Sequence, residues 1–330
     1  MNKRRKLGIA LGVGALVSPF ASFAQQQGKV WRVGFLALRH VNFVDTDYSY
    51  GPFRQTMREL GYVEGKNLVI EWRSAEGKVE RLPDLAGELV QLNVDLIVTA
   101  GNPAVGAAQK ATATIPILIG NGSDPVGSGF VASLARPGGN ITGLSNIVDD
   151  ISPKYLELLI SMVPKLSRIA ILLDLSSTSQ AKVLNNVRAA AKTANITVLP
   201  FDARSPEKIE EAFSLMKKEK AGAVIVVSSG LFVQQARQIA ELAAKHRLPS
   251  ISGYQKYTDA GVMMSYGPNF AENYRRIATY VDKIFRGAKP GDIPVEQPTK
   301  FDLIINGKTA RTLGLKIPQS LLISADKVIE

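Results

Sequence analysis

The chain contains no cysteine and only two histidines, His40 and His246. Without cysteine there is no disulfide framework, no thiol nucleophile and no cysteine-ligated zinc or iron–sulfur centre, and two histidines are too few for an all-histidine metal cage. The sequence also lacks a GxSxG elbow, an HExxH motif and a P-loop, and the glycine pattern Gly8 to Gly14 falls in an N-terminal apolar segment. No metal or cofactor is therefore predicted. Serine or carboxylate catalysis stays open, because such residues need not be close in sequence.

The first 24 residues have the layout of an export signal. Basic residues 3–6 precede an apolar stretch from Leu7 to Val17, and the small residues Ser22 and Ala24 favour cleavage before Gln25. The apolar stretch is well short of the ~20 residues that span a bilayer, which disfavours a membrane anchor. The arginine pair in the basic segment leaves twin-arginine export open beside the Sec route. Both routes predict a periplasmic mature protein.

Charge does not point to a nucleic-acid partner. The formal net charge of +11 falls to +7 (36 minus 29) without residues 1–24, which hold four basic residues and no acidic one. The remaining basic residues are spread along the chain, and the densest cluster, Lys217, Lys218 and Lys220, is predicted to be a solvated helix end. No later segment is apolar for long enough to cross a membrane.

Short apolar runs rich in β-branched residues alternate with amphipathic helical stretches. The predicted strands are 32–38, 67–72, 95–100, 115–119, 141–144, 168–174, 196–201, 223–228, 250–253 and 262–266. The predicted helices are 53–60, 79–92, 104–111, 154–162, 180–194, 206–218, 232–246 and 270–285. This alternation predicts βαβ units and therefore an α/β fold with parallel sheets.

An internal repeat divides these units into two lobes. Residues 67–102 align without a gap on residues 195–230, strand on strand, and each copy continues into a helix and a proline-led strand. The pattern predicts two similar doubly wound sheets that face each other across a cleft, as expected for two domains in 330 residues. The alternative is that any two βαβ segments look alike.

Small polar residues follow the predicted strands of both lobes. Asn102-Pro103 and Asp124-Pro125 each have a capping residue ahead of a proline, and Ser228-Ser229 stands at the matching place in the second lobe. Ligands of doubly wound sheets bind at these carboxyl strand ends, and helix N-termini suit an anionic group such as a carboxylate. The alternative is plain helix capping.

One aspartate and two tyrosines have two interpretations each. Asp124 is either a ligand for an ammonium group or only a cap. Tyr254 and Tyr266 either stack on a ligand or fill the core between the lobes. His246 is predicted to be a helix C-terminal residue, and His40 an ordinary loop residue.

Several motifs together resemble the ABC-transporter substrate-binding proteins related to bacterial tryptophan and tyrosine binders. The resemblance covers about residues 30 to 330 and is carried by FRQTMRELGYVEGKNLVIEWRSAEGKVERLPDLAGELVQLNVDLIVTAGNPA, SDPVGSGFVASLARPGGNITGLSN, LAAKHRLPSISGY, SYGPNF and YVDKIFRGAKPGDIPVEQPTKFDLIIN. It implies a type I periplasmic binding protein, with two Rossmann-like lobes joined by a three-stranded hinge. The implied division is a signal at 1–24, one lobe at 28–146 plus 266–293, and a second at 147–265 plus 294–330.

The resemblance also implies a set of ligand contacts. Carried over position by position, these are Asn102, Ser123, Asp124, Ser145, Asn146, Ser228, Ser229, Tyr254 and Tyr266. One departure puts the ligand in doubt, because the stretch from Arg39 to Tyr50 is longer and more aromatic than in typical members.

The implied function is capture of a small solute by hinge closure, without chemistry. The expected ligand is an amino acid, aromatic or branched, and the expected partners are an inner-membrane permease and its cytoplasmic ATPase. The alternatives are an exported ligand-sensing partner of a membrane receptor and an exported enzyme on the same fold. A sugar-repressor type of regulator is disfavoured, because an export signal stands where a helix-turn-helix would be.

Overall fold

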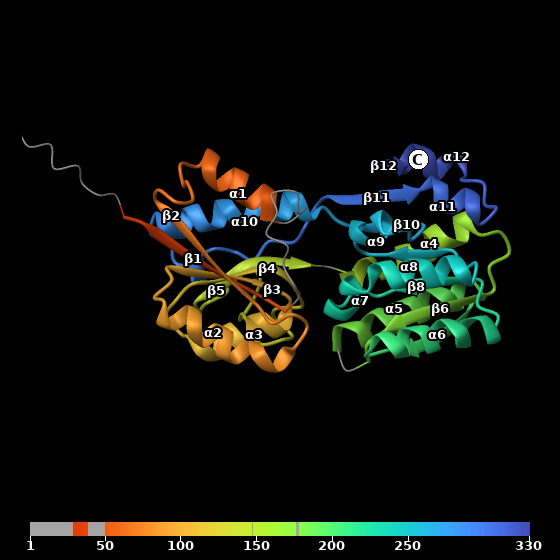
Figure 1. The fold of residues 1–330 in the computed structure, drawn as a ribbon, viewed down its shortest axis with the longest axis horizontal. Coiled ribbons are helices and arrows are strands. Elements are labelled where there is room, and N and C mark those ends of the chain that lie inside the picture. The colour runs from red at the N-terminus through yellow and green to blue at the C-terminus, as the bar shows by residue number, and fades with distance from the viewer. Residues whose placement is uncertain (1–28, 39–49, 147, 176–177) are drawn as a thin grey trace, which may run out of the picture.

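A computed structural model describes residues 29–38, 50–146, 148–175 and 178–330, which form two α/β lobes side by side (Figure 1). The predicted signal at 1–24, His40 and nearly all of the Arg39 to Tyr50 stretch lie outside the described residues. Both lobes are built on a sheet of mainly parallel strands with helices on its two faces. The predicted α/β fold with two parallel-sheet lobes is confirmed.

The smaller lobe has a five-stranded parallel sheet of order β2-β1-β3-β4-β5. Its strands are β1 (Trp31–Ala37), β2 (Leu68–Ser74), β3 (Leu96–Ala100), β4 (Ile117–Ser123) and β5 (Ile141–Asn146). One face packs against α2 (Leu82–Gln91), which the short helix η1 (Val79–Arg81) precedes, and against α3 (Asn102–Ala111). The other face packs against α1 (Tyr50–Glu59) and α10 (Phe270–Phe285), which lie side by side in Figure 1 although they are far apart in sequence.

The larger lobe has a seven-stranded sheet of order β12-β11-β10-β9-β8-β6-β7. Its strands are β6 (Arg168–Leu173), β7 (Thr197–Asp202), β8 (Ala223–Val226), β9 (Ser250–Ser252), β10 (Met264–Pro268), β11 (Phe301–Asn306) and β12 (Lys327–Ile329). One face carries α4 (Val148–Met162), α5 (Thr178–Thr193), α11 (Gly307–Thr312) and α12 (Gln319–Ser324). The other carries α6 (Pro206–Lys218), α7 (Gly230–Gln234), α8 (Ala236–Lys245) and α9 (Gln255–Asp259). Within this sheet β11 runs antiparallel to β10.

The differences from the predicted elements lie mainly after residue 230. The helix predicted over 232–246 is two helices, because Gln235 ends α7 and caps α8. The strands β11 and β12 and the short helices α9, α11 and α12 were not predicted. They fall outside the long βαβ repeats that the periodicity detects.

Three segments carry the chain between the lobes. They follow β5, follow β10 and precede β11, and the last is held to the smaller lobe at Glu296. The Ser145 N–H donates to the Glu296 carbonyl at 2.8 Å, and the Arg276 guanidinium donates to both carboxylate oxygens of Glu296 at 2.7 and 2.5 Å. Arg276 holds the pKa of Glu296 below its ordinary value, so this contact is intact at neutral pH. The lobe boundaries stay a prediction. Residues 266–268, which the prediction assigns to the first lobe, pair with β11 in the larger sheet.

A glycine allows the last strand of the smaller sheet to approach its neighbour. Gly143 of β5 has φ 130°, and a Cβ there would lie 2.4 Å from the Ile119 carbonyl oxygen and 2.5 Å from the Ile119 nitrogen. The register of β4 against β5 shifts between Ile119 and Gly122. An L side chain at 143 would meet backbone atoms that cannot move without breaking the sheet.

We expect Gly143→Ala to lower the free energy of unfolding by about 2 kcal/mol or more. The matched control is Gly87→Ala in α2, where an added Cβ meets nothing within 4 Å. That change is expected to stabilise by about 0.5–1 kcal/mol, because alanine loses less backbone entropy in a helix. Urea denaturation of the two variants gives both values, and similar midpoints would contradict the role of Gly143.

Candidate ligand-binding site

The two lobes approach each other at their strand ends. Gly230, at the start of α7, lies beside Leu38, which follows β1, and an added Cβ would meet the Leu38 Cδ2 at 3.1 Å. A Cβ at Gly77, in the loop after β2, would meet the Gln234 amide of α7 at 3.2 Å. Figure 1 shows α7 at the side of the larger lobe that faces the smaller one. The carboxyl ends of the two sheets therefore line the space between the lobes, as the repeat predicts.

On the smaller lobe, Asn102 joins the loops after β3 and β4. Its Nδ2 donates to the Ser123 carbonyl at 2.8 Å and to the Ser128 Oγ at 3.2 Å, and its Oδ1 accepts from the Ser123 N–H at 2.9 Å. The predicted N-cap role is wrong, because α3 begins at Asn102 and Gly101 is the cap, with φ 93°. The side chain instead shapes a polar rim from two strand ends.

Asp124 links the two lobes. One carboxylate oxygen accepts from the Gly127 N–H at 2.9 Å, and the other pairs with the Lys182 ammonium of α5 in the larger lobe. These two contacts hold the pKa of Asp124 below its ordinary value, and the hydrogen bond from Lys182 has the larger effect. The pair is therefore charged at neutral pH and is lost only as the pH falls through that lowered pKa. Residues 125–129 form turns, so Asp124 does not cap a helix.

Asp124, Ser145 and Asn146, three of the predicted residues, line one open cavity of about 530 Å³ between the lobes. Asn146 is held by a hydrogen bond from its Nδ2 to the Asn121 Oδ1. The remaining walls are Pro125, Val126, Leu134, Lys182, Asn185, Asn186 and Gln297.

Sequence reasoning missed the α5 wall of this cavity. The positions 182, 185 and 186 have the i, i+3, i+4 spacing of one helix face, and all three side chains are polar. A polar helix face directly after the first strand of the second lobe was the signal that could have revealed it.

The predicted residues of the larger lobe are divided among three places. The Ser228 Oγ lies 3.4 Å from the Ser252 Oγ, and Ser229 caps α7 by accepting from the Phe232 N–H at 3.1 Å. Tyr254 follows β9 and lines a second, smaller cavity. Tyr266 packs against the α4 and α5 side of the sheet, and its ring centroid lies 5.9 Å from that of Phe301. The two tyrosines therefore belong to opposite faces.

Neither a metal cluster nor a membrane span is found in the described part of the chain. Among these residues no group of three His, Asp or Glu side chains could hold a metal ion. No helix within the same ranges is long and apolar enough to cross a bilayer. His246 is the C-cap of α8, as predicted.

Residues 41–329 match the family model of the ABC transporter substrate binding protein. The chain belongs to this family. Among relatives of this substrate-binding protein, a tyrosine-binding protein from Clostridioides difficile (strain R20291) is 25% identical over 276 residues, which cover 84% of this chain and 78% of that protein.

Two solved structures share the fold of this substrate-binding protein. A conserved domain protein from Vibrio cholerae O1 biovar El Tor matches with a TM-score of 0.84 at 24% identity, over 91% of this chain and 100% of that one. An ABC domain from Streptococcus pneumonia in complex with L-Trp matches with a TM-score of 0.82 at 24% identity, over 91% and 99%. The type I periplasmic binding fold implied by the sequence motifs is confirmed.

We expect Lys182→Met to increase the mean distance between the lobes in the ligand-free protein, because it removes the pair with Asp124. An exposed pair of this kind is worth about 0.2–1 kcal/mol, so the ratio of open to closed molecules should rise by at most about fivefold. Since the chain has no cysteine, spin labels on cysteines introduced at the exposed positions 110 in α3 and 217 in α6 report only that distance.

The matched control is Lys208→Met, which removes a lysine paired with Glu211 inside α6. It should leave the distance distribution unchanged, whereas salt near 1 M should act like Lys182→Met. An unchanged distribution in Lys182→Met would show that the pair does not hold the lobes together.

Proposed function

We propose that this substrate-binding protein is the periplasmic component of an ABC importer and captures an amino acid between its two lobes. The supporting observation is that strand ends of both sheets meet across a polar space, where Asp124 and Lys182 pair from opposite lobes. The tyrosine-binding relative and the structure that holds L-Trp favour an aromatic amino acid. Binding without a chemical reaction agrees with membership of a family of substrate-binding proteins.

The proposed contacts are the strand-end residues of the two lobes. On the smaller lobe they are Asn102, Ser123, Asp124, Ser145 and Asn146, and on the larger lobe Ser228, Ser229, Tyr254 and Tyr266. Small polar groups hold the charged end of the ligand, while an aromatic ring covers its apolar body. Tyr254 is the better placed tyrosine, because it lines a cavity and Tyr266 packs on the opposite face. Only the closed arrangement buries both ends of the ligand, so binding favours closure.

The proposed partners are an inner-membrane permease with its cytoplasmic ATPase, reached after export and cleavage near Ala24. An importer component needs to be on the far side of the inner membrane to meet its solute. The basic and apolar segments of residues 1–24 supply the export signal.

We expect L-tyrosine or L-tryptophan to raise the unfolding temperature of the mature protein by several degrees. A ligand at one hundred times its Kd stabilises the folded state by about 2.7 kcal/mol, and each kcal/mol is worth roughly 2–4 °C. The protein is first unfolded and refolded to remove bound ligand, and is then heated with amino acids, small carboxylates and sugars in turn. A shift with a sugar alone would overturn the amino-acid proposal, and loss of the added compound would favour an exported enzyme.

Export is tested by expressing the full chain and a form without residues 1–24. The full chain should be recovered from the periplasm with Gln25 as its first residue, and the shortened form should stay in the cytoplasm. Periplasmic recovery of the shortened form would contradict the assignment of the signal.

A further inference from the structure

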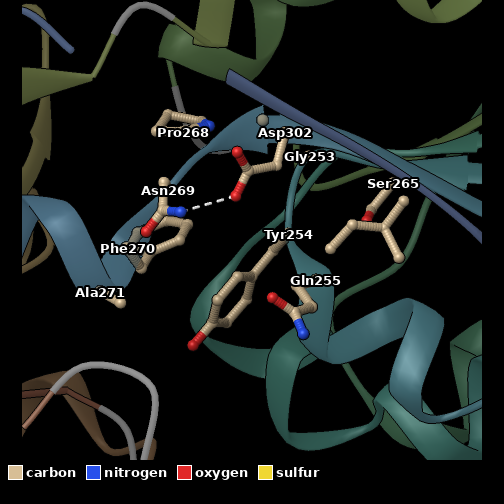
Figure 2. A pocket seen from close by; sticks show the side chains of 11 residues that line it. Gly253, Tyr254, Gln255, Ser265, Pro268, Asn269, Phe270, Ala271 and Asp302 are labelled. Atoms are coloured by element: carbon tan, nitrogen blue, oxygen red, sulfur yellow. Dashed lines mark hydrogen bonds between the residues drawn. The ribbon is translucent and has the colours of Figure 1, made fainter. Parts of the chain in front are cut away.

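A second cavity lies where the chain leaves the larger sheet for α10 (Figure 2). It has a volume of about 80 Å³ and is formed at the carboxyl ends of β9 and β10 and at the start of β11. Four side chains are central to it: Tyr254, Asn269, Phe270 and Asp302. A space of this size holds a few heavy atoms, such as the head group of a ligand, but not a whole aromatic side chain.

Asp302 is the acidic group of this cavity. Its Oδ2 accepts a hydrogen bond from the Asn269 Nδ2 at 2.7 Å, and within the described ranges no lysine or arginine forms a salt bridge with it. Burial, and then the charge of Asp326, raise the pKa of Asp302, while Lys300 and Asn269 act in the opposite direction. A partly buried carboxylate that lies near a second carboxylate and forms no salt bridge within the described ranges would be stabilised by a cation placed beside it.

Two aromatic rings complete the wall of this cavity. The ring centroids of Tyr254 and Phe270 lie 4.5 Å apart, and Tyr254 is only 7% exposed. Figure 2 shows the Tyr254 and Asp302 side chains on opposite sides of the same space. An ammonium group over an aromatic face is attracted to the ring, so carboxylate and rings favour the same kind of ligand group.

Asp124, the acidic residue among the proposed contacts, already has two partners. One carboxylate oxygen pairs with the Lys182 ammonium, and the other accepts a hydrogen bond from the Gly127 N–H. A ligand ammonium at Asp124 would have to displace Lys182 and open the contact between the lobes. Asp302 offers its charge without such a loss.

We propose that Asp302 binds the ammonium group of the amino-acid ligand in this cavity, with the Tyr254 ring beside it. The inference rests on the proposed function and deepens it. It names the residue that lets the protein distinguish an amino acid from the same molecule without its amino group. Asp302 then determines specificity for the ligand class, while the remainder of the cleft determines which side chain is accepted.

The test compares two ligands in two proteins by isothermal titration calorimetry. The ligands are L-tyrosine and 3-(4-hydroxyphenyl)propionate, which lacks the amino group, and the proteins are the wild type and Asp302→Asn. The wild type should prefer L-tyrosine by roughly tenfold or more, the range of a hydrogen bond between charged groups. In Asp302→Asn the preference should disappear, because tyrosine binding weakens while binding of the propionate is unchanged or improved.

The control is Asp326→Asn, which removes a nearby negative charge that does not line the cavity. The Asp326 Oδ2 accepts from the Leu303 N–H at 2.8 Å, and an asparagine oxygen can keep this bond. This variant should keep the wild-type preference for L-tyrosine, and an unfolding temperature for each variant verifies that it is folded. If Asp302→Asn keeps the preference for L-tyrosine, or if Asp326→Asn loses it to the same extent, the proposed role of Asp302 is overturned while the proposed function stands. A wild type that binds no amino acid would overturn the proposed function and this inference together.

Discussion

Parallel pairing of strands is the constraint on which the rest of this structure depends. Each parallel strand needs a crossover to return the chain, so the carboxyl ends of neighbouring strands all lie at one edge of a sheet. In this protein both sheets present that edge to the space between the lobes. Within the smaller lobe, Asn102 and Ser145 lie at the same edge of the sheet for this reason, although they are far apart in sequence. No local motif has to specify such a site, which agrees with the absence of any enzyme signature.

Much of the fold could be predicted because burial on both faces of a parallel strand leaves a continuous apolar run. The strands β1, β3, β6 and β8 carry such buried runs, and all of β1 to β10 were located to within a few residues. The C-terminal strands are different: β11 pairs antiparallel with β10 and begins with two half-buried residues, and β12 is only three residues long and partly exposed. These strands pair only after the chain has returned from the smaller lobe, and no local sequence pattern indicates that return.

The candidate site was predictable as a set of loops but not as a set of contacts. Strand ends identify the loops, whereas partners across a cleft depend on how two lobes meet. Lys182 pairs with Asp124 at a separation of 58 residues, and the interaction leaves no trace in either local sequence. Asp302 was missed for a related reason, because it lies on β11, whose place beside β10 was not foreseen. Ser229 shows the opposite case, in which the plain capping interpretation is visible in the structure.

The position of α10 bears on the order in which the two lobes can fold. This helix is made after β10 of the larger lobe, yet its Tyr274, Ile277 and Val281 complete the core between the smaller sheet and α1. A chain made N-terminus first therefore leaves part of one apolar face of its first sheet uncovered until residue 285 has been made. During that interval the first lobe lacks part of its core and cannot reach full stability. The late return of a single helix thus makes completion of the first lobe depend on synthesis of nearly the whole chain.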